Sequence, residues 1–201
     1  MYIVAITGAS GPVLGIRLIE LILKSGKEVL AIVSDSAWET ISYEMFKSRK
    51  RFRSVKDVLS EKGSEPDFAL LKECSPGDYF SPAASGTSKN EGVIVVPCSM
   101  KTLGAIASGY ADSLITRAVD VALKEERRVI IVPRETPLNL IHLENLVKVR
   151  RAGVSVVIPA PGFYTFPATI EDVVDFIVGK ILNLLEIEHN LFPEWGQSLE
   201  N

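Results

Sequence analysis

The chain alternates short apolar runs with longer stretches of helical periodicity. Apolar, largely β-branched runs, which are typical of parallel strands covered on both faces, lie at 2–7, 28–34, 92–97, 128–133 and 154–160. Apolar residues at helical spacing predict helices over 12–25, about 37–46, 101–109, 113–126, 138–153 and 170–185. This alternation predicts a three-layer, doubly wound α/β fold with a mainly parallel sheet.

The pattern weakens between residues 47 and 90, where turn-forming residues are frequent and no element is predicted. This stretch begins with the basic run "KSRKRFRS" (47–54), which we interpret as a solvated surface or connection. A polar tail follows the last predicted helix from about residue 186. We therefore expect residues 1–201 to form one domain with this tail at its end.

Composition narrows the class of protein. The chain has 201 residues, 47% of them hydrophobic and 23% charged, and a formal net charge of −3. This balance gives no reason to expect a nucleic-acid partner, and no apolar stretch is long enough to cross a membrane. Cys74 and Cys98 are the only cysteines and lie outside any metal-ligand spacing, so we expect reduced thiols, no metal site and a cytoplasmic protein.

Ligands of such sheets bind beyond the carboxyl ends of the strands, so the loops that follow strands are the candidates for a site. The first, "TGASG" (7–11), contains Gly8 and Gly11, which let the backbone approach a phosphate, and Ser10, whose hydroxyl suits hydrogen bonding or proton relay. A tight turn without a ligand is the alternative. The spacing GxxGxxxG differs from the GxGxxG of dinucleotide sites, which disfavours NAD(P).

Two more loops carry polar groups directly after strands. "PCSMKT" (97–102) brings Ser99, Lys101 and Thr102 to a helix start, which suits a phosphate or a flavin edge, although Ser99 is equally suited to be a simple N-cap. "PRETP" (133–137) holds Arg134 and Glu135 between two prolines. Because proline stiffens the loop, it suits a positioned cation and acid; a surface ion pair is the alternative.

Other candidates lie further along the chain. Arg117 and Lys124 are seven residues apart, on one face of a predicted helix, which suits a second phosphate site if they are not simply solvated. "PAPGFYTFP" (159–167) supplies aromatic residues and the hydroxyl of Tyr164. The two histidines, His142 and His189, form no persuasive catalytic triad, which favours a reaction without a histidine base.

Taken together, "GASG", "PCSMKTLGAIASGYADSLITRAVDVALKE", "PRETPL" and "PGFY" resemble the UbiX-type flavin prenyltransferases from residue 3 to about residue 196. The resemblance implies a flavodoxin-like Rossmann variant that joins a dimethylallyl group, usually from dimethylallyl monophosphate, to N5 and C6 of reduced FMN. It further implies a metal-independent transferase and a homododecamer with sites at subunit contacts. The product, prenylated FMN, is the cofactor of UbiD-type decarboxylases and links the family to ubiquinone biosynthesis.

The resemblance also implies roles for individual residues. Ser10 and Glu135 handle protons. Residues expected to hold FMN are Gly8, Ala9, Ser10, Ser34, Ser99, Met100, Lys101, Thr102 and Arg134. Residues expected at the prenyl phosphate and its apolar pocket are Tyr164, Lys180, Arg117, Lys124 and Trp195, with Arg117 and Lys124 acting across a subunit contact.

Some features depart from the family pattern. "GPVLG" lacks the aromatic residue often found after the glycine loop, the segment 47–73 is longer and more charged than expected, and Lys180 stands where many relatives have arginine. Three alternatives stay open: an FMN-dependent cysteine decarboxylase of the phosphopantothenoylcysteine type, an NAD(P)-dependent reductase, and a non-catalytic FMN carrier. The first is disfavoured because no histidine precedes His142 and "PRET" replaces an asparagine-containing loop.

Overall fold

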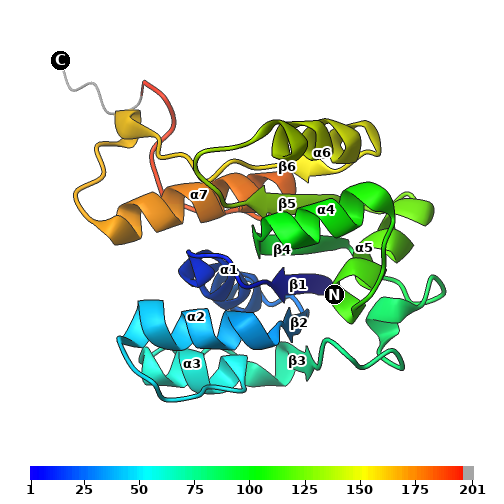
Figure 1. The fold of residues 1–201 in the computed structure, drawn as a ribbon. Coiled ribbons are helices and arrows are strands. Elements are labelled where there is room, and N and C mark those ends of the chain that lie inside the picture. The colour runs from blue at the N-terminus through cyan, green and yellow to red at the C-terminus, as the bar shows by residue number, and fades with distance from the viewer. Residues whose placement is uncertain (197–201) are drawn as a thin grey trace.

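A single sheet organises the computed structural model, which describes residues 1–196. Its strands are β1 (Tyr2–Ile6), β2 (Val29–Val33), β3 (Leu71–Cys74), β4 (Gly92–Cys98), β5 (Val129–Pro133) and β6 (Ser155–Val156). The strands pair in the order β3-β2-β1-β4-β5-β6 (Figure 1). Every pair is parallel. The predicted α/β class is confirmed, and the sheet of the described residues is wholly parallel.

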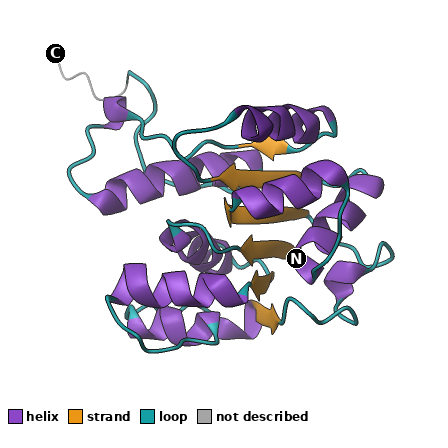
Figure 2. Cartoon of the chain, viewed as in Figure 1, coloured by secondary structure: helices purple, strands orange, loops and turns teal. Residues whose placement is uncertain are grey.

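Helices cover both faces of this sheet (Figure 2). They are α1 (Pro12–Lys24), α2 (Asp35–Phe46), α3 (Val55–Glu61), α4 (Met100–Ser108), α5 (Leu114–Lys124), α6 (Leu140–Arg151) and α7 (Ile170–Leu184). One core cluster joins α1, α2, α3 and α7 to the sheet, and a second joins α4, α5 and α6 to the opposite face. Because alternate residues of β1 point to opposite faces, Val4 and Ile6 lie in the first cluster while Ile3 and Ala5 lie in the second.

The strand order places a crevice at the carboxyl ends of β1 and β4. From β1 the chain continues to β2 on one side, whereas β4 continues to β5 on the other, so the connections diverge at this point. The order is that of the Rossmann fold, and without the edge strand β3 it is that of flavodoxin. Such a switch point is where ligands of open parallel sheets bind.

Close packing of α1 on the sheet fixes the loop that enters this crevice. A Cβ added at Gly15 would lie 2.8 Å from Cγ1 of Ile6 on β1. Gly11, the N-cap of α1, adopts a left-handed conformation with φ of 88°, which favours glycine. Gly11 therefore serves the turn and Gly15 the helix–sheet contact, whatever ligand the loop holds.

The segment between residues 47 and 90 contains two elements that the sequence pattern did not predict, α3 and β3. The carboxylate of Glu73 on β3 accepts hydrogen bonds from Val55 N at 2.8 Å and Lys56 N at 3.3 Å, and so caps α3. Arg51 and Arg53 of the basic run are exposed, as expected, but Phe52 between them is only 3% exposed. The segment is thus a folded part of the α/β layers.

The predicted strand over 154–160 is wrong in extent. Strand pairing with β5 covers only Ser155 and Val156, with one further backbone hydrogen bond from Val157 N to Ile131 O at 2.9 Å. As the edge of the sheet, this strand has a neighbour on one side only. The apolar residues that follow it instead line hollows beside α7.

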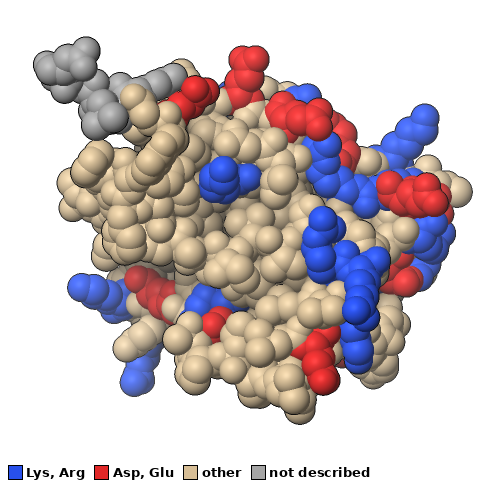
Figure 3. All heavy atoms as spheres, turned by 90° about the horizontal axis from the view of Figure 1, so that it is seen from above, with Lys and Arg blue, Asp and Glu red and all other residues tan. Residues whose placement is uncertain are grey.

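The β6 end of the molecule carries an apolar surface. Figure 3, which looks down on this end, shows a broad area without charged side chains. Exposed large apolar residues of α6 and of the loops beside it are Leu138, Leu140, Ile141, Leu143, Val147, Ile158, Phe163 and Phe166. We call these residues the apolar face. In residues 1–196 no helix combines the length and apolar character needed to span a membrane.

Candidate active site

Thr7 ties together the two loops that flank the crevice. Its side chain is buried, and Oγ1 donates to Pro97 O at 2.8 Å while accepting from Ser99 N at 2.8 Å. The loop after β1 therefore stays in fixed register with the loop after β4. No local pattern predicts this role of Thr7, because its partners lie 90 and 92 residues away along the chain.

Gly8 lets the loop after β2 approach the same point. A Cβ at Gly8 would lie 2.7 Å from Cβ of Ser36, a separation that side chains do not tolerate. Ser36 Oγ in turn lies 3.2 Å from Ser34 Oγ. Gly8 thus brings two serine hydroxyls beside its own backbone.

Three helices begin around this point, each capped by a serine. Ser34, Ser99 and Ser113 accept from the backbone N–H groups of residues 37, 102 and 116, at 3.2, 3.3 and 3.3 Å. The cap of α5 is a full capping box, in which Ser113 N also donates to Oγ1 of Thr116 at 3.2 Å. The positive ends of α2, α4 and α5 consequently converge.

These caps line a hollow of about 410 Å³, here called the hydroxyl hollow. Its lining residues are Thr7, Gly8, Ser34, Asp35, Ser36, Pro76, Ser99, Lys101, Thr102, Ala105, Asp112, Ser113, Ile115 and Thr116. Helix N-termini and the cation of Lys101 favour an anion here, whereas the carboxylates of Asp35 and Asp112 oppose one. The many hydroxyls suit a polyhydroxylated chain. A phosphate ester of a sugar alcohol fits this donor set.

A second hollow of about 370 Å³, here called the Arg134 hollow, lies on the other side of the first loop. It combines Ser10, Arg134 and Glu135 with apolar walls from α1, α7 and the loop after β6. Arg134 is held in place by two contacts, Nε to Ser10 O at 3.3 Å and its backbone N to Cys98 O at 3.2 Å. Three polar groups against apolar walls suit a flat, partly polar ring system.

The predicted stiffness of the "PRETP" loop is matched by local hydrogen bonds. Oε1 of Glu135 accepts from Thr136 N at 3.0 Å, and Oγ1 of Thr136 donates to Glu135 O at 2.8 Å. Glu135 remains exposed and forms no ion pair with Arg134 within residues 1–196. The alternative of a surface ion pair between these two residues is therefore wrong.

Glu44 of α2 lies against the first loop and was not among the predicted site residues. Its Oε2 accepts from the backbone N of Gly11 at 2.8 Å, so a carboxylate lies at the N-terminus of α1. The residue is 33 positions from the loop that it contacts, and no local motif marks it.

Lys180 lines a third hollow, of about 420 Å³, between α7 and the loop after β6. Lys180 lines it together with Phe176, and Ile158 and Ile177 are shared with the Arg134 hollow. The ring of Tyr164 meets Phe176 edge-on at 5.8 Å and Trp195 at 4.9 Å between centroids. The structure thus packs Tyr164 against both Phe176 and Trp195. Phe176 in turn lines the hollow of Lys180, which shares two residues with the Arg134 hollow.

Arg117 and Lys124 do not join this group within one chain. Arg117 Nη1 pairs with Oδ2 of Asp120 at 2.6 Å, and Lys124 pairs with Glu125. Lys124 ends α5 and precedes the start of β5 by a few residues, so it lies toward the amino ends of the strands. In the parallel sheet that edge is opposite the two hollows.

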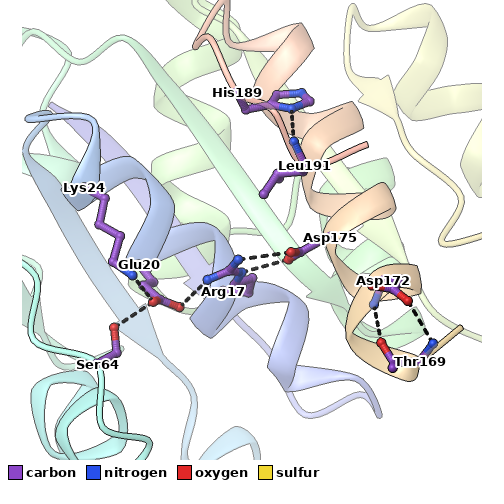
Figure 4. Close-up of polar contacts among 9 residues, drawn as sticks. All are labelled: Arg17, Glu20, Lys24, Ser64, Thr169, Asp172, Asp175, His189 and Leu191. Carbon is purple, nitrogen blue, oxygen red and sulfur yellow. Dashed lines mark hydrogen bonds and ion pairs between the residues drawn. The ribbon is translucent and has the colours of Figure 1, made fainter. Parts of the chain in front are cut away.

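The remaining candidates have mainly structural contacts. Ala9 is buried with its N–H bonded to Thr7 O at 2.7 Å, and Met100 packs against the second core cluster. His189 Nε2 lies 3.0 Å from Gly179 O, and its Nδ1 accepts from Leu191 N at 3.3 Å (Figure 4). His142 Nδ1 is buried without a hydrogen-bond partner in the described part of the chain. Both histidines lie outside the hollows.

Known proteins resemble this chain along its whole length. The Flavoprotein family model matches residues 1–182. Flavin prenyltransferase UbiX of Halalkalibacterium halodurans is 45% identical over 202 residues, which cover 100% of this chain and 96% of the relative.

Two solved structures share the fold at substantial identity. A crystal structure of AnUbiX (PadA1) in complex with FMN and dimethylallyl pyrophosphate has a TM-score of 0.86 and 39% identity, covering 97% of this chain and 96% of its own. A dodecameric FMN-dependent UbiX-like decarboxylase from Escherichia coli O157:H7 has a TM-score of 0.82 and 37% identity, covering 97% and 99%. The chain belongs to the Flavoprotein family and, within it, to the UbiX flavin prenyltransferases.

Proposed function

We propose that this protein is a flavin prenyltransferase, which joins a dimethylallyl group from dimethylallyl monophosphate to N5 and C6 of reduced FMN. Prenylated FMN is the product and a UbiD-type decarboxylase its recipient. The observation that carries this proposal is the placing of Gly8 and Ser10, two residues apart, on two different hollows. One flavin phosphate ester spans both hollows across a single turn.

The chemistry of each hollow matches one part of FMN. Gly8, the capping serines and Lys101 hold the phosphate and the ribityl hydroxyls in the hydroxyl hollow. Ser10 and Arg134 hold the ring system against the apolar walls of the Arg134 hollow. Reduced flavin supplies the electron-rich atoms that the prenyl group attaches to.

The cations near the Arg134 hollow stabilise the departing phosphate. Transfer breaks the bond between the allylic carbon and the phosphate oxygen, so negative charge grows on the leaving group. Lys180 and the hydroxyl of Tyr164 bind this phosphate, while Phe176 and Trp195 provide apolar surface for the prenyl chain and aromatic faces for positive charge. Arg117 and Lys124 complete the phosphate site from a neighbouring subunit.

Ser10 and Glu135 handle protons in this proposal. Both line the Arg134 hollow, and hydrogen bonds to Thr136 fix the loop that carries Glu135. A protonated Glu135 donates to the leaving phosphate as general acid, and Ser10 relays the proton released from the flavin.

In an oligomer, a neighbouring subunit would cover the apolar face, and Lys124 would reach the site of a neighbouring subunit. We propose a homododecamer, supported by the dodecameric relative from Escherichia coli and by the exposed leucines of α6. Residues 1–201 make one flavin-binding domain of each subunit. Cys74 and Cys98 are free thiols, which supports a reducing, cytoplasmic setting.

The test is an anaerobic reaction of the purified protein with reduced FMN and dimethylallyl monophosphate, followed by the mass of the released flavin. We expect a gain of one five-carbon prenyl unit that requires the donor. Glu135→Gln should bind FMN normally but transfer the prenyl group at least about 100-fold more slowly. Glu65→Gln, an exposed carboxylate far along the chain from the site, is the matched control and should behave as wild type.

The same purified protein, given other substrates, distinguishes the transferase from the carrier and the cysteine decarboxylase. Bound but unmodified FMN with both dimethylallyl monophosphate and the diphosphate would contradict the transferase and favour a carrier. Loss of carbon dioxide from a cysteine-containing substrate, without prenyl transfer, would identify a cysteine decarboxylase.

A further inference from the structure

A hollow beyond the carboxyl ends of β2 and β3 takes no part in the proposed flavin chemistry. Its volume is about 470 Å³, compared with about 410 Å³ for the hydroxyl hollow, and small-molecule sites commonly have such volumes. The N-terminal turn of α2, the loop at 51–53 and the end of β3 enclose it. Asp35 and Pro76 line both hollows, so the two adjoin.

The side chains of this hollow include cations that lack partners. Arg51 and Arg53 line it and form no ion pair with any residue from 1 to 196. The buried ring of Phe52 anchors the loop between them, so both guanidinium groups start from a fixed backbone. An arginine that has no ion-pair partner and a fixed backbone is suited to bidentate binding of phosphate.

The acidic residues of the hollow divide into two kinds. Glu73 caps α3 and is not available to a ligand. Its carboxylate accepts hydrogen bonds from Ser54 Oγ at 3.0 Å, from Val55 N at 2.8 Å and from Lys56 N at 3.3 Å. Asp35 and Glu39, by contrast, have no ion-pair partner in the described chain. A carboxylate after the second strand of a Rossmann-type sheet commonly accepts hydrogen bonds from ribose hydroxyls.

Trp38 supplies an aromatic surface to the same hollow. Its indole is half-buried against the first core cluster and also lines the hollow. Stacking on an aromatic side chain is the common way for proteins to hold a nucleobase without hydrogen-bond readout.

We propose that this hollow binds a nucleoside 5′-phosphate: Trp38 stacks on the base, Asp35 and Glu39 accept from the ribose hydroxyls, and Arg51 and Arg53 bind the phosphate. Two sources supply this chemistry. One is a free nucleotide. The other is the adenylate part of FAD, whose flavin part then occupies the two hollows beside the first loop. The site itself does not depend on prenyl transfer.

The probe is adenosine 5′-monophosphate, titrated into the full chain carrying Trp195→Phe, so that Trp38 is the only tryptophan. We expect saturable quenching of its fluorescence with a dissociation constant below about 1 mM. Arg51→Ala and Arg53→Ala should each weaken binding about tenfold. Adenosine without a phosphate should bind wild type weakly and be indifferent to both substitutions.

Arg49→Ala is the matched control, since Arg49 belongs to the same basic run but does not line the hollow. Equal losses for Arg49→Ala and Arg51→Ala would overturn the proposal, because they would indicate attraction by the basic run alone. The absence of saturation up to about 10 mM nucleotide, with circular dichroism confirming folded protein, would also overturn it.

FAD distinguishes the two sources. If the adenylate of FAD occupies the hollow, FAD binds more tightly than FMN, and Arg51→Ala weakens FAD but not FMN. If a free nucleotide is the ligand, FAD binds no more tightly than FMN, and saturating FMN leaves the affinity for adenosine 5′-monophosphate unchanged. A failure of prenyl transfer changes neither result, so the two proposals fail independently.

Discussion

Arg17 on α1 holds both carboxylate oxygens of Asp175 on α7. Nε donates to Oδ1 at 2.8 Å and Nη2 donates to Oδ2 at 3.0 Å, while Nη1 of the same guanidinium donates to Oε2 of Glu20 at 3.0 Å (Figure 4). Glu20 also accepts from Lys24 Nζ at 2.6 Å and from Ser64 Oγ at 2.7 Å. One network therefore joins α1, α7 and the segment before β3, and holds the walls of the Arg134 hollow together.

Asp175→Asn should destabilise the fold, because it breaks a two-point charged contact between helices. We expect a loss of about 2 kcal/mol in the free energy of unfolding, measured by urea denaturation. Glu61→Gln breaks the exposed pair with Lys50 and is the matched control, with an expected loss below about 0.5 kcal/mol. Equal losses of unfolding free energy in the two variants would show that the α1–α7 contact stabilises the fold no more than an exposed ion pair.

Acid should weaken the same network through Glu20. Burial of this carboxyl acts to raise its pKa, but hydrogen bonds from Lys24, Ser64 and Arg17 outweigh burial and lower the pKa to about 2. Because the pKa is lower in the folded state than in the unfolded chain, the stabilisation is complete above about pH 4.5 and is lost as the pH falls toward 2.

Thermal unfolding between pH 2 and pH 6 measures this effect. Wild type should exceed Glu20→Gln in Tm at pH 6, by the equivalent of about 1 to 2 kcal/mol after allowance for solvent screening. The difference should shrink as the pH falls below 4.5. A difference that stays constant over this range would mean that Glu20 acts through packing and not through its charge.

Gly8→Ala should impair FMN binding without unfolding the protein. The added Cβ meets Ser36, so the loop after β2 must move away from the hydroxyl hollow. We expect at least about a tenfold rise in the dissociation constant of FMN, measured by fluorescence quenching of the flavin. Gly104→Ala is the control: its nearest neighbour is Asn145 Nδ2 at 3.8 Å, and alanine suits a helix. Unchanged affinity in Gly8→Ala would place the phosphate elsewhere.

The strands and helices that bury an apolar face were predictable, because their periodicity is local. α3 and β3 were not, since α3 has only seven residues and depends on a cap from Glu73, and β3 is a half-exposed edge strand. The strand predicted over 154–160 was too long because the apolar residues after Val156 line hollows, and apolar runs do not distinguish the two settings.

The residues of the candidate site also fall into those that a local sequence pattern predicts and those that only the fold brings together. The loops after β1, β4 and β5 were found because each carries polar residues directly after an apolar run. Ser113 and Thr116 were missed, because only the fold returns the start of α5 to the carboxyl edge of the sheet. Ser36 was missed because only the fold brings it against Gly8. Helical spacing placed Arg117 and Lys124 on one face but gave no information on their distance from the first loop.

Substitution of Arg117 and Lys124 therefore tests whether two subunits share the prenyl phosphate site. If a neighbouring subunit supplies them, Arg117→Ala and Lys124→Ala should each raise KM for dimethylallyl monophosphate about tenfold and leave FMN affinity within about twofold. Both variants should keep the oligomer mass of wild type in analytical ultracentrifugation. Lys62→Ala, an exposed lysine outside every hollow described above, is the matched control. Equal losses of affinity for both ligands would point to damage of the fold or of a subunit contact, and unchanged kinetics would remove the two cations from the site.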